Sequence, residues 1–349
     1  MVLTLIGLGL ADSRDISLKG YDATKAADYV YMESYTSCLI ASKEELEECY
    51  GKNIIDADRD LVEMGCEVLL DRAESAKVVL LVVGDPLCAT THADIVLRAK
   101  RRGISVEIIH NASIMSAIGI CGLDSKIELL LSIPFDQMYR FGETISIPFF
   151  ENNWKPDSFY DRIKRNRDSN LHTLCLLDIK TKERSLENLM RDRRVYEPPR
   201  FMMIRQAIEQ LFEIEHIRKE NVCHESVKVF GVARVGTQTE RIKSGTLHQL
   251  TKEEFGEALH SLIICAPQLH DVENEFYEYY CSNDVSRTGE LDVITFRCYI
   301  YSTVKTGQDV PLPRPRPRPR PRPSPVGSLD PVIIIKTKTM GVVVCVRSE

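Results

Sequence analysis

The sequence lacks the features that mark a membrane, secreted or metal-binding protein. No apolar run is long enough to span a bilayer, and no basic region precedes the apolar segment 2–6, so we expect neither a membrane span nor a signal peptide. The 11 cysteines are scattered, with no C-x-x-C pair and no Cys/His cluster at zinc spacing. We interpret them as small buried apolar residues in a reducing cytosol, which predicts a cytoplasmic protein without a metal site.

The sequence also lacks an excess of positive charge. Its net charge at pH 7 is −6, which argues against nucleic acid as a partner. The 349 residues are 44% hydrophobic and 28% charged, as in ordinary globular proteins, and can bury one or two cores. Composition therefore predicts a folded globular protein, and the motifs must indicate its chemistry.

The most informative stretch is the apolar run 78–83, which is followed by Gly84-Asp85-Pro86. Six apolar, mostly β-branched residues predict a strand that is buried on both faces, as in a parallel sheet. Pro86 ends the strand, and Thr91 to Asp94 resembles a capping box that starts a helix over 95–102. Asp85 then follows the carboxyl end of a buried strand, where ligands bind in open α/β sheets, although the residue types also fit a simple turn.

The first 120 residues alternate between strand and helix patterns. Strands are expected at 2–6, 29–32, 53–57, 78–83 and 105–110, with helices at 15–27, at 43–50 (capped by Ser42), from Asp58 and at 95–102. Asn111 or Ser113 can cap a further short helix. This alternation predicts a parallel, doubly wound sheet. The turn Gly7-Leu8-Gly9 resembles the start of a dinucleotide fingerprint, but Asp12 occupies the place of the third glycine.

The pattern changes after Gly122. Strands are expected at 144–150, 172–179, 227–235 and 261–265, with a hairpin over 241–250 and helices that end near Asn170 or cover 202–215 and 252–259. Fewer helices separate these strands, so we expect a mixed α+β domain. From about Cys281 the periodicity is lost, and 311–325 is an almost strict Pro-Arg alternation. Such a tract is typical of a disordered tail, or of a ligand for a proline-recognising module.

Several of these motifs together resemble the diphthine synthases, which belong to the tetrapyrrole-methylase class of methyltransferases. The resemblance covers residues 1 to about 280 and rests on these segments: 7–10, 33–37, 83–92, 110–115, 174–180, 196–200, 231–236 and 259–263. It implies a two-domain fold, with a methylase domain at 1–123 and a mixed α+β domain at 137–280. Residues 124–136 are an apolar insertion relative to the family, and 281–349 is a low-complexity tail outside the match.

The resemblance also implies a reaction. Family members use S-adenosyl-L-methionine to methylate the 3-amino-3-carboxypropyl-histidine of elongation factor 2, three times on the amine and once on the carboxylate, and they act as homodimers. Carried over by position, the cofactor contacts would be Leu10, Asp85, Cys88, Ser113, Ile114, Leu177, Val235 and His260. Cys88 departs from the family, which commonly has glycine there, and a side chain at that point could crowd the ligand. His260 also fits a structural hydrogen-bonding role.

Three functions follow from these observations. The first is the methyltransferase, whose activated donor requires alignment and exclusion of water rather than a catalytic triad. The second is a nucleotide-cofactor oxidoreductase, favoured by Gly7 and Gly9 and opposed by Asp12. The third is a binding protein that keeps the methylase fold without turnover, favoured by Cys88 and by the insertion 124–136. No residue is assigned a catalytic role.

Overall fold

We describe the fold from a computed structural model of the chain. The chain divides after residue 294, and residues 1–294 form a compact first unit. The structure describes residues 1–33, 35, 39, 41–123, 140–151, 153–181, 183, 188, 190, 191, 193, 195–282, 285 and 286, all of them in the first unit. The insertion 124–136 and the Pro-Arg tract lie outside the described residues.

The first sheet has five strands in the order β3-β2-β4-β1-β5. These are β1 (Val2–Gly7), β2 (Tyr29–Glu33), β3 (Ile54–Ala57), β4 (Lys77–Val82) and β5 (Ser105–Ile109). Every neighbouring pair is parallel. The expected strand 78–83 is β4, at the centre of the sheet, so the prediction of a buried parallel strand is confirmed.

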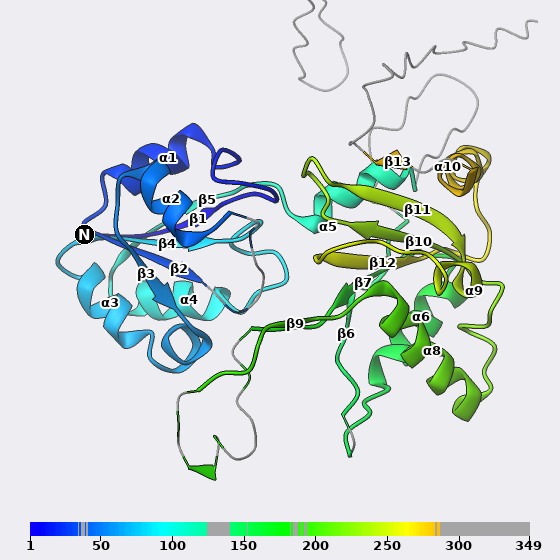
Figure 1. Cartoon of the computed structure of the whole chain (residues 1–349). Helices are drawn as coiled ribbons and strands as arrows, with labels where there is room; N and C mark the ends of the chain where they lie inside the picture. Colours follow the sequence, from blue (N-terminus) through cyan, green and yellow to red (C-terminus); the bar gives the residue numbers. More distant parts are fainter. Residues whose placement is uncertain are drawn as a thin grey trace, which may run out of the picture. The chain divides into compact units, whose positions relative to one another are not determined.

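Alternating side chains of the strands divide the first core into two layers. Leu3 and Leu5 of β1 pack with α3 (Glu67–Ala73) and α4 (Ala93–Arg101). Ile6 belongs to the opposite layer, with α2 (Lys43–Tyr50) and the end of α1 (Leu18–Lys25). The two pairs of helices are seen on opposite sides of the sheet in Figure 1. The sheet is therefore doubly wound, as the sequence predicts.

Two predictions in this half need correction. The helix expected from Asp58 is interrupted: a π-helical turn, η1 (Asp60–Met64), precedes α3. The capping box at Thr91 is absent, because the N-cap of α4 is His92 without a side-chain cap bond, and the Thr91 hydroxyl instead donates to Glu63 Oε1 at 3.2 Å. Neither difference alters the order of the strands.

The second sheet is mixed and has the order β13-β11-β10-β12-β7-β6. Its strands are β6 (Ile145–Ile147), β7 (Thr173–Leu177), β10 (Lys228–Ala233), β11 (Arg241–Thr246), β12 (His260–Ile264) and β13 (Val285–Ser286). Only β6 and β7 pair in parallel. A separate ribbon joins β8 (Ile179–Lys180) to β9 (Arg200–Phe201). The expectation of a mixed α+β second half is confirmed.

Helices cover both faces of the second sheet. α6 (Ser158–Asp168) and α8 (Ile204–Arg218) pack on one face. Two short helices, α5 (Ile114–Ala117) and η2 (Ile118–Cys121), pack on the other together with α10 (Asp271–Ser282). The chain therefore passes from the end of β5 directly into a helix that contributes to the second core.

Three further expectations in this half were wrong. Residues 252–259 are irregular rather than helical, because the carbonyls of Phe255 and Glu257 accept hydrogen bonds from Arg234. Residues 247–250 form the short helix α9 (Leu247–Leu250), capped by Thr246, rather than a hairpin strand. Regular structure also continues past Cys281, since α10 ends at Ser282 and β13 pairs with β11.

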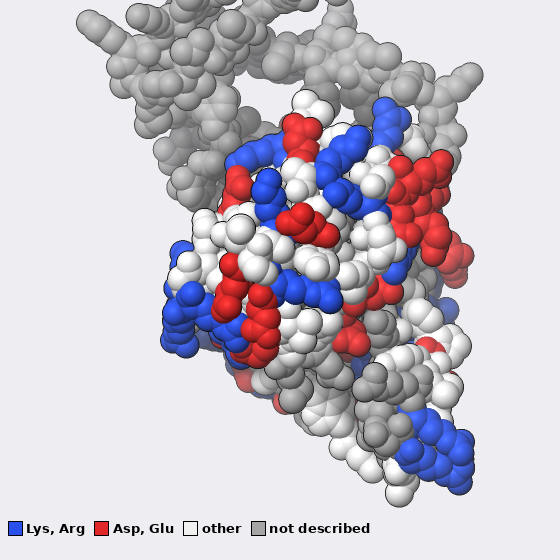
Figure 2. Space-filling view, turned by 90° about the vertical axis from the view of Figure 1, so that its left-hand side faces the viewer, with Lys and Arg blue, Asp and Glu red and all other residues white. Residues whose placement is uncertain are grey.

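The described surface carries interspersed charges. Figure 2 shows basic and acidic side chains mixed over one face. Arg102, which follows α4, contacts Asp71 of α3 at 2.6 Å and Glu74 at 3.3 Å. Among the described residues we find no helix long and apolar enough to cross a membrane, and no cluster of His, Cys, Asp and Glu that could hold a metal ion.

Candidate active site

The candidate site is a pocket of about 360 Å³ at the carboxyl ends of the first sheet. All five parallel strands contribute residues just past their ends: Leu10 after β1, Tyr35 after β2, Arg59 after β3, the loop 83–90 after β4 and Ser113 after β5. The second half of the chain supplies the rest of the lining from the ends of β6, β7, β10 and β12. Both the volume and the position are typical of a small-molecule site in an α/β protein.

Glycines allow three of these strand ends to approach closely. Gly9 and Gly84, which have φ of 80° and 76°, exchange two backbone hydrogen bonds of 3.2 and 2.8 Å. A Cβ on Gly7 would lie 2.5 Å from the Gly84 carbonyl oxygen and 2.7 Å from Asn111 Cβ. These glycines therefore allow close backbone contacts between the chain segments at the ends of β1, β4 and β5.

The same turn does not offer its amides to a phosphate. The N–H groups of Leu10 and Ala11 donate to Asp15 Oδ2 at 3.1 and 2.8 Å. A dinucleotide site needs such backbone donors for the pyrophosphate. Here a carboxylate of the chain occupies them, which opposes the oxidoreductase alternative.

Asp85 joins the loop after β4 to the end of β5. Its Oδ1 accepts from Leu87 N at 2.9 Å, and its Oδ2 accepts from Asn111 N at 3.2 Å and lies 2.8 Å from His110 Nδ1. Burial raises the pKa of this carboxyl, but the hydrogen bonds from Leu87, His110 and Asn111 outweigh it, so the pKa is lowered. Asp85 is ionised at neutral pH, lines the pocket and holds two loops together.

The rest of this loop is held by its own side chains. The Pro86 carbonyl accepts from Thr90 Oγ1 at 3.1 Å and lies 3.1 Å from Nδ1 of His92, a fully buried side chain. Cys88 lines the pocket and is partly exposed. Besides Gly84, the residue of this loop with left-handed backbone is Ala89, with φ of 56°, and not Cys88. The conformation at position 88 therefore does not require glycine.

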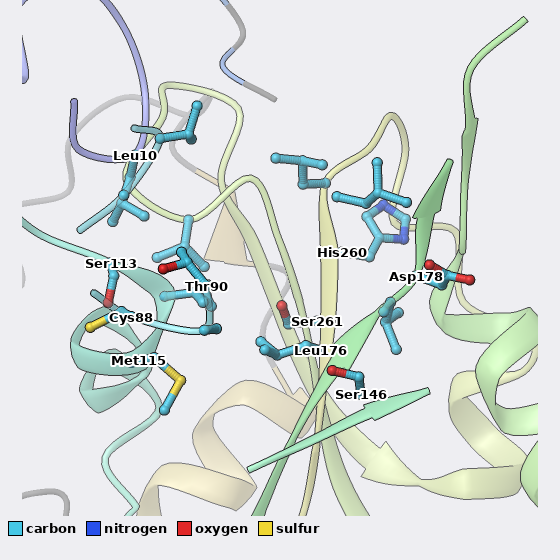
Figure 3. Close-up of a pocket in the computed structure, with 18 of the residues that line it drawn as sticks. Leu10, Cys88, Thr90, Ser113, Met115, Ser146, Leu176, Asp178, His260 and Ser261 are labelled. Atoms are coloured by element: carbon cyan, nitrogen blue, oxygen red, sulfur yellow. The ribbon is translucent and has the colours of Figure 1, made fainter. Parts of the chain in front are cut away.

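The pocket brings together all the predicted cofactor contacts. Ser113 is the N-cap residue of α5, as expected for one of the two candidate caps, and Ile114 begins that helix. Leu10 packs against the turn after β10, since a Cβ on Gly236 would lie 3.2 Å from Leu10 Cβ. Figure 3 shows Leu10, Cys88 and Ser113 on one side of the pocket and His260 on the other. The following residues line it: Leu10, Asp85, Cys88, Ser113, Ile114, Leu177, Val235 and His260.

His260 is held as a neutral ring. Its Nε2 donates to the Glu257 carbonyl at 2.9 Å, and its Nδ1 accepts from Ile204 N, the first residue of α8, at 3.4 Å. Burial lowers the pKa of His260. With both nitrogens in use, the ring supplies a wall of the pocket rather than a proton-transfer group.

Sequence reasoning did not single out several polar members of the lining. Asp178 follows β7, and its Oδ2 accepts from Phe149 N at 3.0 Å. The signal for it was present, because an aspartate follows β7 as Asp85 follows β4. The other polar members are these: Tyr35, Arg59, Ser146, Arg234, Thr237 and Ser261. Tyr35 and Arg59 lie just past the ends of β2 and β3, and they reach the pocket because these strands lie beside β4 in the sheet, in the order β3-β2-β4.

The residues present fit a sulfonium methyl donor with an adenosyl group. Apolar side chains from both halves can enclose a flat base, and the carboxylates of Asp85 and Asp178 suit a cationic ligand. Arg234 also lines the pocket, but its guanidinium donates to the carbonyls of Thr239, Phe255 and Glu257 and so is held by the chain itself. The lining therefore combines apolar side chains with polar groups, many of them oriented by hydrogen bonds, as a cofactor with an apolar base and charged groups requires.

Comparison with known proteins identifies the family. Residues 2–122 match the family model described as Tetrapyrrole (Corrin/Porphyrin) Methylases. The chain is 51% identical over 282 residues to a diphthine methyl ester synthase of Dictyostelium discoideum, which covers 80% of this chain and 98% of the relative. The chain belongs to the diphthine methyl ester synthase family. It is therefore a methyltransferase of the tetrapyrrole methylase fold.

Two further relatives agree with this assignment. The diphthine methyl ester synthase of Homo sapiens is 47% identical over 283 residues, covering 80% of this chain and 95% of the relative. A crystal structure of diphthine synthase superimposes with a TM-score of 0.67 at 35% identity, covering 81% of this chain and 96% of that chain. The similarity to diphthine synthases expected from the motifs is thus confirmed.

Proposed function

We propose that the chain transfers methyl groups from S-adenosyl-L-methionine to the 3-amino-3-carboxypropyl-histidine of elongation factor 2, giving diphthine methyl ester. The observation that carries this proposal is the convergence of the eight predicted cofactor contacts on one pocket. They lie far apart in the sequence, and their meeting at the carboxyl ends of the strands supports a shared ligand.

The proposed chemistry balances without a metal or a second cofactor. When bound, the donor supplies an activated methyl group, and each transfer breaks one S–C bond and leaves a neutral thioether. On the acceptor, three transfers form C–N bonds and release one proton each, while transfer to the carboxylate forms a C–O bond and releases none. The chain has to align donor and acceptor and to exclude water.

The chain's residues contribute in distinct ways. Ile114 and Leu177 enclose the donor, and the hydrogen bonds of Asp85 fix the loops on which Cys88 and Ser113 lie. The Asp85 carboxylate also favours positive charge in the pocket, which suits both a sulfonium and an ammonium. Neutral His260 adds no opposing charge.

A methyl-transfer assay tests the proposal. Purified protein is incubated with methyl-labelled S-adenosyl-L-methionine and elongation factor 2 carrying the aminocarboxypropyl group, and label in the factor is counted. The matched control is the same factor with unmodified histidine. We expect label only with the modified factor. Donor binding by calorimetry without transfer would instead support the alternative of a binding protein that has lost turnover.

We further propose that the protein acts in the cytoplasm as a homodimer. Exposed apolar side chains support an interface between copies: Trp154 is 54% exposed, Val195 57% and Met190 80%. Light scattering at micromolar concentration should give twice the monomer mass. A monomer mass under those conditions would contradict the dimer.

A further inference from the structure

Arg59 is a pocket residue whose hydrogen-bonding groups are not used by the fold. It lies two residues past the end of β3 and lines the pocket. Its guanidinium stacks over the ring of Tyr35, 5.3 Å from the ring centre. Its nearest acidic partner is Glu63, at 3.6 Å from Nε, which is longer than a hydrogen bond. Among the described residues, the guanidinium therefore makes no hydrogen bond.

The other basic groups of the pocket are already engaged. Arg234 donates to three backbone carbonyls and to Thr239 Oγ1. His260 is hydrogen-bonded through both nitrogens. Arg59 is thus the basic side chain of the described lining that keeps its donors for a ligand. Its side chain is 67% exposed, so a ligand entering the pocket can reach it.

The ring of Tyr35 packs against one face of this guanidinium. Its side chain is buried, and burial raises the pKa of its hydroxyl to about 12, so the ring is a neutral phenol. A neutral aromatic face attracts a guanidinium and orients its plane. The π-helical turn η1 begins at the next residue, and such irregular turns are frequent at functional sites.

The strand order separates Arg59 from the predicted donor contacts. In the first sheet these contacts follow β4, β1 and β5, whereas Tyr35 and Arg59 follow β2 and β3. Because neighbouring strands lie about 4.8 Å apart, the end of β3 is about 10 Å from the end of β4. This part of the pocket is therefore beside the donor contacts rather than among them.

We propose that Arg59 binds the carboxylate of the acceptor's aminocarboxypropyl group. This inference rests on the function proposed above. A guanidinium matches a carboxylate with two parallel hydrogen bonds, so it would fix the orientation of the adjacent amine toward the donor methyl. The donor carries an aminocarboxypropyl group of its own, so the experiment must distinguish the two carboxylates.

The experiment compares two forms of elongation factor 2, one with diphthine and one with diphthine methyl ester. These differ in the acceptor carboxylate and share the trimethylammonium group. Binding is measured by calorimetry with S-adenosylhomocysteine present. The wild-type protein should prefer the free carboxylate by about tenfold or more. Arg59→Gln should bind both forms equally, and Arg59→Lys should keep part of the preference.

Arg205→Gln is the matched control. Arg205 also lies four residues before a glutamate, Glu209, but on α8 and outside the pocket lining. This variant should keep the wild-type preference. The affinity for S-adenosylhomocysteine alone should be unchanged in all three variants.

The possible failures are distinguishable. If Arg59→Gln keeps the full preference, or the wild-type protein has none, the Arg59 inference is wrong while the methyl-transfer assay still decides the function. If Arg59→Gln weakens S-adenosylhomocysteine instead, the guanidinium serves the donor and the inference is also wrong. If the wild-type protein neither binds nor methylates the modified factor, both the function and the inference fail.

Discussion

Single residues of the site were predictable to different degrees. Asp85 and Ser113 follow strands whose pattern is plain in the sequence, and the ends of parallel strands meet at one edge of a sheet. Arg59 and Tyr35 follow strands equally plain, but their place in the pocket depends on β2 and β3 lying next to β4. Strand order is a property of the whole sheet, so local patterns could not reveal these two residues.

Asp85 gives the first prediction. We expect Asp85→Ala to weaken S-adenosyl-L-methionine by more than tenfold, about 1.4 kcal/mol, through loss of a charged partner and of the hydrogen bonds to Leu87 and Asn111. Calorimetry on the folded variant measures this change. His110→Ala is the control, because it removes a neighbour of Asp85 while keeping the carboxylate.

Two results would contradict a direct role for Asp85. An unchanged donor affinity in a folded Asp85→Ala variant would leave Asp85 as a turn residue. An equal loss in His110→Ala would assign the effect to the position of the loop rather than to charge.

Elements were predicted best where their signals are local. Ser42 and Glu45 form the capping box of α2, with Ser42 Oγ accepting from Glu45 N at 3.2 Å, and Gly51 ends the helix with φ of 64°. The helix expected at 252–259 is absent because contacts from Arg234, which follows β10 and is distant in sequence, determine the backbone there. Propensity cannot anticipate such tertiary contacts.

α10 was missed because its buried face includes a charged residue. Glu273 is fully buried, and one oxygen lies 3.0 Å from His172 Nε2 while the other accepts from His270 N at 2.8 Å and from Arg140. His172 Nδ1 accepts from Ala266 N at 3.0 Å, so its proton is on Nε2. This network fixes the start of α10 to Arg140 and to His172, which precedes β7.

Glu273 gives a prediction on pH. Burial raises its pKa, but hydrogen bonds from His172 and His270 N–H, with the charge of Arg140, outweigh burial and lower it from 4.5 to about 2. A lowered folded pKa contributes stability above the unfolded pKa, and this stability is lost as pH falls from about 4.5 to 2. The loss should be roughly 3 kcal/mol, measured by urea unfolding across this range.

Glu273→Gln is the matched variant, since it keeps the shape and removes the titration. It should be less stable than the wild type at pH 7 because Arg140 loses its charged partner. Its stability should change less between pH 5 and 3. An acid dependence as steep as that of the wild type would show that other carboxyls dominate.

At the scale of the whole molecule, truncation tests whether the tail contributes to the stability of the folded part. Regular structure reaches Ser286, where β13 pairs with β11. The Pro-Arg tract beyond it has a composition that does not form a core. We therefore expect truncation after Ser286 to leave the melting temperature nearly unchanged in a thermal melt. Truncation after Tyr280 removes β13 as well, and provides the comparison. A large loss of stability on truncation after Ser286 would show that the tail packs on the folded part.

The insertion 124–136 gives the last prediction, and it concerns how the molecule tolerates added chain. It lies outside the described residues, but the residues on either side of the undescribed stretch, Leu123 and Arg140, are both buried. Loop-closure cost grows slowly with length, so removing this segment should change stability by only about 1 kcal/mol. Its apolar side chains should nevertheless seek burial, and we expect them to reach the pocket beside Ser113. They are Ile127, Leu129, Leu130, Leu131, Ile133 and Phe135.

Deleting residues 124–136 should therefore raise donor affinity or turnover while the melting temperature barely changes. A small misplacement of reacting groups can cost a transfer about a hundredfold, so relief of crowding should be measurable in the methyl-transfer assay. The matched control keeps the length of the insertion and replaces its six apolar residues with serine. If crowding is the cause, this variant should also gain activity. If the full chain already methylates the factor as fast as both variants, the insertion does not act on the site and the crowding argument is wrong.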